Sequence, residues 1–512
     1  MSPIFWNIRG LLNQQGQRFL HFSYNDRSAC IPPQMYRGRQ LIDLLASEGL
    51  VVTGSRSIKS LFDNISSVSD FEPADIIEGP GFGNGRFTLG DGSIFGPGAA
   101  GPIIAFTRDA HAAAASGTLE GWRDQIAQSL TGQRVPMMAA LLGFAAPLAA
   151  MTQRPMCKSI ECVGNIASGI DILPVILASV TGVSTRRMLQ FRQVVNGDVP
   201  PLYNDAAVPM AGTDVFMAGE NCAKRTLAVK NYLIHTLGNA QGGTVGLESG
   251  RPGCLVSFCR QPLLDYVDEG SNLPSLAAGH HLSIRLPSNL PYGIFRSLPE
   301  GCPDSAALVL RLMKMADLHH GVALRRFLSY VTDELSTDQK AFDALVSNYI
   351  RVFRKYAAGD RNDHREAIGT DTLALTYAAG RIAQTAGILP SDWRIGRAVM
   401  KTYRDDLYRP TSPRSFNDVL LELAAGDDVL HLDGREHDVG LIELAQVFVK
   451  HRKRRSELMI RSDAIDAVLP DLDVWAKTPS LQNSMVKEDG HRTVKRLLPG
   501  NVSERMFCFR LP

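Results

Sequence analysis

Short apolar runs separated by glycine-rich turns dominate the first part of the chain. Two such turns, Gly79–Gly83 and Gly90–Gly92, lie on either side of the run Arg86–Leu89. Short apolar runs between turn residues are typical of β-strands joined in hairpins. The pattern therefore predicts a β-rich N-terminal region over residues 1–110.

The pattern changes at Thr118, where strand-like runs begin to alternate with helix-like ones. Apolar residues at helical spacing after Thr118 predict a first helix, which Thr118 or Ser116 can cap. A long apolar helix over 135–151, a strand over Ser159–Val163 and a helix over Ile172–Thr181 follow. Alternating strands and helices indicate an α/β core, which we place at 111–300.

Helical periodicity dominates residues 301–408. The expected helices cover Ala306–Leu318, Val322–Leu335, Ala341–Tyr356, Thr372–Ala386 and Trp393–Leu407. Gly387 and Pro390 follow the fourth of them, in the order expected at the end of a helix. This part of the chain is therefore predicted to be a helical region.

The proline-containing segment Arg409–Pro413 predicts a linker before a last module at 409–512. Helix-like patterns cover Phe416–Ala425 and Leu441–His451, and strand-like runs cover Thr493–Leu498 and Arg505–Phe509. Helices followed by a hairpin predict a winged-helix-like module.

Composition places the chain among ordinary globular proteins. Of its 512 residues 45% are hydrophobic and 21% are charged, and the formal net charge is +2. A chain of this length divides into about two to four domains. The protein is not basic throughout, so any DNA contact has to come from a local patch. Its 8 cysteines form no CxxC pair or zinc-type cluster, which predicts reduced thiols in a cytoplasmic protein.

One segment is apolar enough to raise the question of a membrane. Val135–Gln153 carries no acidic or basic residue and is long enough to span a bilayer, but it contains Pro136, Gly143 and Pro147. We favour a buried helix of the α/β core. Residues Met1–Gly10 lack the basic start and apolar centre of a signal peptide, so no membrane association is expected.

A phosphate-binding loop with altered chemistry follows the strand Ser159–Val163. Gly164 and Gly169 stand at the spacing of G-x-x-x-x-G-K-[ST]. Ile170 replaces the lysine that reaches the β- and γ-phosphates, and Asp171 replaces the hydroxyl that binds Mg²⁺. Backbone amides alone can still hold an anion. We therefore treat Gly164, Gly169, Ile170 and Asp171 as a vestigial nucleotide-binding loop.

Asp171 also has a structural interpretation. It precedes the helix Ile172–Thr181, where an aspartate is a favourable N-cap and its charge suits the positive helix end. We hypothesise that its carboxylate takes the electrostatic place of a phosphate.

Several segments together resemble one known family. They are Ser116–Arg123, Gly143–Leu148, Leu237–Gly242, Pro287–Phe295, His320–Leu328 and Asp489–Leu511. The chain resembles the helicase-like proteins of the domain of unknown function 927 family, which are often carried on bacterial mobile elements. The resemblance runs from about residue 15 to the end. It implies a P-loop ATPase core of the AAA+ kind, a helical lid at 301–408 and a role on DNA.

The resemblance also points to further site residues. It places the acid-ended strand at Val215–Glu220, where Gly219 replaces a metal-binding aspartate and Glu220 remains as a candidate catalytic remnant. An alternative alignment takes Asp214 as that acid, but Asp214 precedes the apolar run instead of ending it. The family's arginine would fall near Ser283, so that Arg285 is an arginine candidate. Loss of the lysine, the hydroxyl and the metal aspartate together leaves little means of phosphoryl transfer.

One dense basic run lies in the last module. It consists of Lys450, His451, Arg452, Lys453, Arg454 and Arg455, and it closes a predicted amphipathic helix. Such a run can bind DNA phosphates without reading sequence. The alternative is a solvated helix end. The pairs His280–His281 and His319–His320 lack metal-ligand spacing, and no metal is expected.

These features favour a multidomain α/β fold and a helicase-like, mobile-element-associated protein with an inactive nucleotide site. It would act by binding DNA, or as a non-catalytic subunit beside an active ATPase or in a homo-oligomer. No cofactor is expected, whereas a working site would need ATP and Mg²⁺. Two alternatives remain: an active ATP-dependent helicase that uses replacement residues, and a structural or inhibitory partner without DNA affinity.

Overall fold

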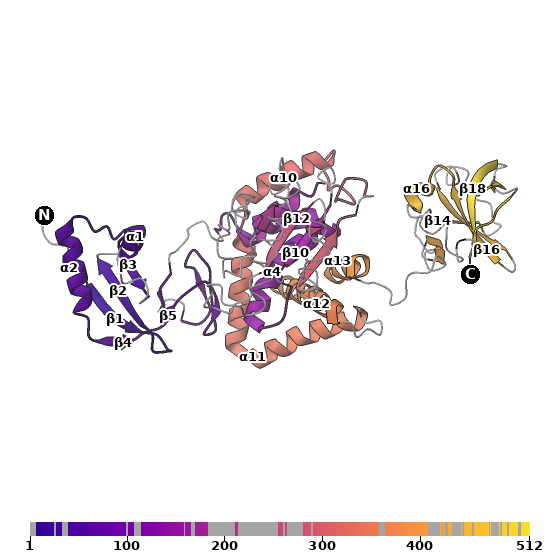
Figure 1. Ribbon diagram of the computed structural model, residues 1–512. Helices are drawn as coiled ribbons and strands as arrows, with labels where there is room; N and C mark the ends of the chain where they lie inside the picture. Colours follow the sequence, from indigo (N-terminus) through magenta and orange to yellow (C-terminus); the bar gives the residue numbers. More distant parts are fainter. Residues whose placement is uncertain are drawn as a thin grey trace, which may run out of the picture. The chain divides into compact units, whose positions relative to one another are not determined.

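The structure is a computed structural model, and two compact units divide it at Tyr408 and Arg409, where the linker was expected. In the first unit it describes residues 7–24, 27–32, 39–98, 101–106, 114–157, 159–164, 169–182, 210–212, 254–259, 262–263, 280–287, 290–357 and 364–407. In the second unit it describes 420–421, 423–424, 429–432, 442, 445–452, 455–469, 472, 481, 484–488, 491–499 and 503–511. Each unit is described by itself (Figure 1).

The chain opens with a four-stranded sheet in the order β3-β2-β1-β4. Its strands are β1 (Asn7–Leu12), β2 (Arg18–Tyr24), β3 (Arg27–Ile31) and β4 (Phe71–Pro73). The first three are antiparallel neighbours, whereas β4 runs parallel to β1. The strands predicted for residues 1–110 are therefore present, together with two helices that the sequence pattern did not predict.

The two faces of this sheet have different partners. Helices α1 (Arg39–Ser47) and α2 (Ser55–Ser66) contribute to one apolar cluster with Leu20, Phe22 and Ile31. Alternate residues of the strands point to the opposite face. There, Leu11, Phe19 and Cys30 form a second cluster with Ile76 and Ala105. Helices thus cover one face, and the segment around β5 (Ile76–Ile77) and β9 (Ile103–Ile104) covers the other.

A small antiparallel sheet, β6-β7-β8, joins the N-terminal region to the core. It consists of β6 (Gly81–Gly83), β7 (Arg86–Thr88) and β8 (Ile94–Phe95). Phe87 and Leu89 are fully buried in the main hydrophobic core. Arg325 of the core donates to the Ser93 hydroxyl over 2.8 Å and forms an ion pair with Asp91.

A four-stranded parallel sheet forms the centre of the first unit, in the order β11-β12-β10-β13. Its strands are β10 (Ser159–Val163), β11 (Met210–Gly212), β12 (Leu255–Cys259) and β13 (His281–Arg285). Every side chain of β10 is buried. The fold is therefore a mixed α/β one, as the alternating pattern predicted.

Helix α4 (Arg134–Thr152) packs against α5 (Ile172–Thr181), α11 (Val322–Ala357), α12 (His364–Thr385) and α13 (Ile395–Thr402) (Figure 1). Among the described helices it is the one long and apolar enough to cross a membrane, but 89% of its apolar window is buried inside the protein. A helix that is apolar all round requires such surroundings. The prediction of a buried core helix is confirmed.

The helical region is also close to its prediction. It consists of α10 (Ser305–Leu318), α11 (Val322–Ala357), α12 (His364–Thr385) and α13 (Ile395–Thr402), which a π-helical turn extends to Leu407. Helix α11 breaks at Asp338, whose backbone is not helical (Figure 1). The Asp338 carboxylate accepts from the Ala341 amide over 3.0 Å, so it caps the second limb.

The segment that leads into the core packs closely against His319. A Cβ atom on Gly117 would lie 2.2 Å from His319 Nδ1, and one on Gly121 would lie 2.3 Å from its Cε1. The Thr118 hydroxyl accepts from the Gly121 amide over 3.0 Å, so the predicted cap of helix α3 (Leu119–Trp122) is confirmed. Both glycines are needed because a histidine ring occupies the space of their missing side chains.

The second unit contains a five-stranded sheet in the order β14-β15-β16-β18-β17. Its strands are β14 (Val429–Leu432), β15 (Val447–Arg452), β16 (Arg455–Arg461), β17 (Thr493–Leu497) and β18 (Ser503–Arg510). Both faces bury apolar residues. Val449, Leu458 and Phe509 lie in one cluster, and Phe448, Met459 and Cys508 lie in another.

This sheet corrects two predictions. The helix predicted over Leu441–His451 is wrong from Val447 onward, because the run Val447–Val449 pairs with Leu458–Ile460 as a strand. Tertiary pairing decides a short apolar run of this kind, which periodicity leaves ambiguous. The closing hairpin is confirmed as β17 and β18, but it belongs to a larger sheet. The unit is therefore not the helices plus one hairpin that suggested a winged helix.

Candidate functional site

The candidate loop leaves the carboxyl end of β10, between β12 and β13. The Gly164 amide donates to the Cys259 carbonyl over 2.8 Å, and the Leu286 amide donates to the Val163 carbonyl over 2.8 Å. Gly164 is thus tied to β12, and Val163, the residue before it, is tied to the residue that follows β13. In α/β sheets, ligands bind at this edge.

Gly164 has a packing reason to be glycine. A Cβ atom there would lie 2.4 Å from Leu286 Cδ1 and 2.8 Å from Leu286 Cβ. Leu286 in turn packs against the main core. An apolar side chain therefore lies against the beginning of the loop.

Gly169 and Ile170 form the turn into helix α5. Gly169 has a φ of +85°, a left-handed conformation that favours glycine. The amides of Ile172 and Leu173 donate to the carbonyls of Gly169 and Ile170 over 3.3 and 3.0 Å. Ile170 is 1% exposed and belongs to the main core. The side chain at the lysine position thus packs into the protein interior.

Asp171 does not cap helix α5. It stands at the N-cap position with helical backbone angles (φ −64°, ψ −16°), and its side chain makes no capping hydrogen bond. The side chain is exposed. The prediction of a side-chain cap is wrong because a capping aspartate adopts an extended backbone, from which its carboxylate can reach the amides of the first turn.

Strand β11 lies shortly before the two candidate acids, Asp214 and Glu220, in the sequence. Met210–Gly212 pairs in parallel with β12 at the edge of the core sheet. In the sequence, Asp214 is the first acid after this strand. Both Glu220 and Asp214 lie outside the described residues. The assignment of either acid to the site therefore stays a prediction.

Ser283 and Arg285 lie on β13 beside the loop strand. Ser283 pairs in register with Glu161, and Arg285 pairs with Val163. Arg285 is exposed at the carboxyl end of its strand, next to the residue that precedes Gly164. A guanidinium there is at the right edge of the sheet to meet an anion at the loop.

A buried polar chain that the sequence did not suggest lies below the loop. The Ser159 hydroxyl is 2.9 Å from His281 Nδ1, and His281 Nε2 is 3.2 Å from Glu161 Oε1. The other Glu161 oxygen accepts from the Leu263 amide over 2.9 Å. An acid inside an otherwise apolar strand is the signal that could have indicated it.

The order of serine, histidine and glutamate resembles a hydrolase triad, but no substrate can reach it. Ser159 has 0% and Glu161 has 1% of its surface exposed. The Ser159 hydroxyl and one Glu161 oxygen have hydrogen-bond partners, whereas His281 Nε2 and Glu161 Oε1 are within ion-pair distance of each other without a hydrogen bond. The chain ties β10 to β13 and to the segment after β12, so its role is structural.

The other histidine pair is accounted for by packing. His319 Nδ1 accepts from the Thr118 amide over 3.3 Å, and His320 Nδ1 is 3.0 Å from the Ala316 carbonyl. Among the residues that the structure describes, no group of three or more possible ligands could hold a metal ion.

The basic run lies on a hairpin. Lys450 and Arg452 end β15, and Arg455 begins β16 directly opposite Arg452. Lys453 and Arg454 lie outside the described residues. His451 stacks on His431 of β14 with ring centroids 5.3 Å apart.

The fold is that of a mixed α/β protein, and comparisons with known proteins show what it is similar to. Residues 15–197 match the sequence model of the domain of unknown function family DUF927. A solved structure of SCCmec type IV Cch, described as an active helicase, has a TM-score of 0.56 at 13% identity, over 100% of this chain and 93% of that one. No curated protein matches. The match confirms the resemblance to the DUF927 family over residues 15–197, and the solved structure shows a likeness of fold over the whole chain.

Proposed function

We propose that this chain is a helicase-like, mobile-element-associated protein that does not hydrolyse ATP and acts through DNA. The burial of Ile170 carries the proposal. A working loop needs a cation at this position, aimed at the phosphates. Here the side chain is apolar and 1% exposed. The name of the similar solved structure, an SCCmec-encoded helicase, supports the helicase-like class.

The negative charge of Asp171 beside the loop also disfavours binding of ATP. Asp171 is exposed at the start of α5, where a phosphate would approach the helix amides. Its negative charge repels a triphosphate. Arg285 is the described cation nearest in register to the loop, and it lies on a different strand. It can attract an anion, but it does not replace the hydroxyl that holds Mg²⁺.

The nucleotide part of the proposal is tested by titrating ATP with Mg²⁺ and measuring turnover. We expect no Mg²⁺-dependent hydrolysis. Glu220→Gln and Asp214→Asn serve as paired controls, one for each candidate acid of the nucleotide site. Turnover that either substitution abolishes would show a working ATPase with replacement residues.

The DNA part depends on the basic hairpin. Lys450, Arg452 and Arg455 lie on adjacent strand ends, and two further cations join them in the sequence. Because each bound phosphate releases counterions, affinity for DNA should fall steeply as salt rises. The hairpin would hold the DNA backbone and leave base edges unread.

A four-alanine variant of Arg452, Lys453, Arg454 and Arg455 tests this interaction. We expect lower affinity for duplex and single-stranded DNA, and a salt slope that is shallower by about one unit for each phosphate that the variant no longer binds. The matched control replaces four exposed cations elsewhere: Arg56, Lys314, Lys340 and Lys355. An unchanged slope in the hairpin variant would instead favour a protein partner, such as an active ATPase subunit.

A further inference from the structure

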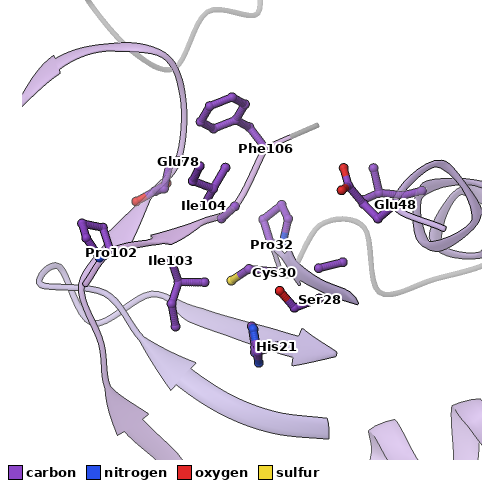
Figure 2. A pocket seen from close by; sticks show the side chains of 13 residues that line it. His21, Ser28, Cys30, Pro32, Glu48, Glu78, Pro102, Ile103, Ile104 and Phe106 are labelled. Atoms are coloured by element: carbon purple, nitrogen blue, oxygen red, sulfur yellow. The ribbon is translucent and has the colours of Figure 1, made fainter. Parts of the chain in front are cut away.

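The N-terminal region contains a pocket of about 360 Å³ (Figure 2). It lies beside the edge strand β3, and its lining comes from the sheet, from Leu44 of α1 with Glu48, and from the segment around β9. His21 and Cys30 pair in register across β2 and β3, so their side chains share one face of the sheet. The segment Pro102–Phe106 closes the other side. The volume is within the range of small-molecule sites.

The apolar part of the wall is large enough to hold a hydrocarbon or aromatic group. It is formed by Ala29, Pro32, Leu44, Ile103, Ile104 and Phe106. Figure 2 shows Phe106 and Ile104 opposite the sheet that carries His21. Burial of apolar surface would supply most of the affinity for such a group.

His21 gives the pocket a buried polar group without a partner. It is 8% exposed, and its Nδ1 atom has no hydrogen-bond partner among the described residues. Burial, followed by the charge of Arg9, lowers the pKa of His21, so its imidazole is neutral near pH 7. A buried unpaired nitrogen costs free energy that a ligand hydrogen bond would recover.

Cys30 adds a second uncharged group. Burial, and then the Glu78 carboxylate, raise the pKa of its thiol to about 12. The thiol therefore stays protonated and is a weak nucleophile. The pocket is thus suited to binding and not to cysteine chemistry.

The charges of the lining are acidic. Glu48 and Glu78 lie on two sides of the pocket in Figure 2, and no lysine or arginine is among the described residues that line it. Glu78 also accepts from the Asn13 amide over 2.6 Å, which holds its carboxylate in place. Arg9 lies opposite His21 in β1 but is exposed and outside the lining. Phosphates and carboxylates are disfavoured, whereas a cation can pair with either glutamate.

We propose that this pocket binds a small apolar molecule that carries a protonated amine. The apolar group lies between the sheet and Ile103–Phe106, the ammonium pairs with Glu48 or Glu78, and His21 Nδ1 bonds a polar atom of the ligand. The site is separate from the nucleotide loop, so neither proposal depends on the other.

The test titrates the full chain with phenethylamine and with phenylacetate, an anion of nearly the same shape, by ligand-observed NMR and calorimetry. We expect saturable binding of phenethylamine and at least about tenfold weaker binding of phenylacetate. The variants Glu48→Gln and Glu78→Gln, combined, should weaken phenethylamine binding about tenfold or more. Glu72→Gln, an exposed acid on β4 outside the pocket, is the matched control and should leave it unchanged.

A filling variant tests the place of binding. Ser28 lines the pocket from an exposed position on β3, so Ser28→Phe adds volume to the site and leaves the buried core intact. It should abolish binding while the thermal unfolding curve stays close to wild type. The proposal is overturned if phenethylamine does not saturate, if phenylacetate binds equally well, or if Ser28→Phe or the double glutamine variant binds like wild type.

Discussion

Ile170 and Gly164 illustrate how single positions of a motif can serve packing. Ile170 lies in the main core, and Leu286 fills the space beside Gly164. A P-loop needs a glycine for the approach of a phosphate, whereas this one is required by the approach of a leucine. The spacing of the phosphate-loop motif is retained, but these two positions pack against apolar side chains of the protein.

Ile170→Lys should destabilise the protein by more than about 2 kcal/mol, because it places an unpaired charge in an apolar site. Asp171→Thr, one residue further on and exposed, should change stability by less than about 0.5 kcal/mol. Urea unfolding measures both. If Ile170→Lys is as stable as wild type, the position is open to the loop and the case for an inactive site weakens.

Gly164→Ala should lower the free energy of unfolding by about 1–3 kcal/mol, because the added Cβ atom forces Leu286 to move. Leu286→Ala in the same chain should recover part of this cost, so a double-mutant cycle would show coupling between the two positions. Additive effects would mean that another group limits the space at Gly164.

Among helices, the residue at the N-cap position makes a capping hydrogen bond in some cases and not in others. The side chains of Thr118 and Asp304 accept from backbone amides of the first turns of α3 and α10, over 3.0 and 2.8 Å. Asp171 stands at the same place in α5 without such a bond. Sequence shows the residue type at a cap, but backbone angles decide whether its oxygen reaches an amide.

Alanine substitutions should reproduce this difference. Thr118→Ala and Asp304→Ala should each lower the free energy of unfolding by about 1 kcal/mol. Asp171→Ala should lower the free energy of unfolding by at most a few tenths of a kcal/mol, since it removes only an attraction to the positive helix end. Chemical denaturation of the three variants checks the order. An equal loss of stability at Asp171 would show that its carboxylate does cap the helix in solution.

At the scale of the whole molecule, each unit contains its own hydrophobic core. The first unit is built around the sheet β11-β12-β10-β13 and its helices, and the second around the two faces of its five-stranded sheet. A core of its own is what allows a domain to fold alone.

Fragments 1–408 and 409–512, produced separately, should each unfold cooperatively. The sum of their circular dichroism spectra should match that of the full chain. DNA affinity with a steep salt slope should remain with 409–512, which carries the basic hairpin. Failure of the short fragment to unfold cooperatively would show that its sheet needs the rest of the chain.

Long, strongly periodic or continuously apolar patterns were enough to predict several elements and their order along the chain. The strand Ser159–Val163, the helix Ile172–Thr181 and the buried helix α4 were all predictable, because side-chain period and apolar length are local properties. Spacing also showed the phosphate-loop pattern of Gly164 and Gly169.

The role of several of these positions depends on packing between distant segments and could not be predicted from local patterns. Periodicity could not reveal that Val447–Arg452 is a strand, because pairing with β16 overrides the helical pattern. Nor could it reveal that Glu161 meets His281 from another strand 3.2 Å away, or that Ile170 is buried. Packing between distant segments sets burial, hydrogen bonding and charge environment, and these determine whether a motif can act on a phosphate.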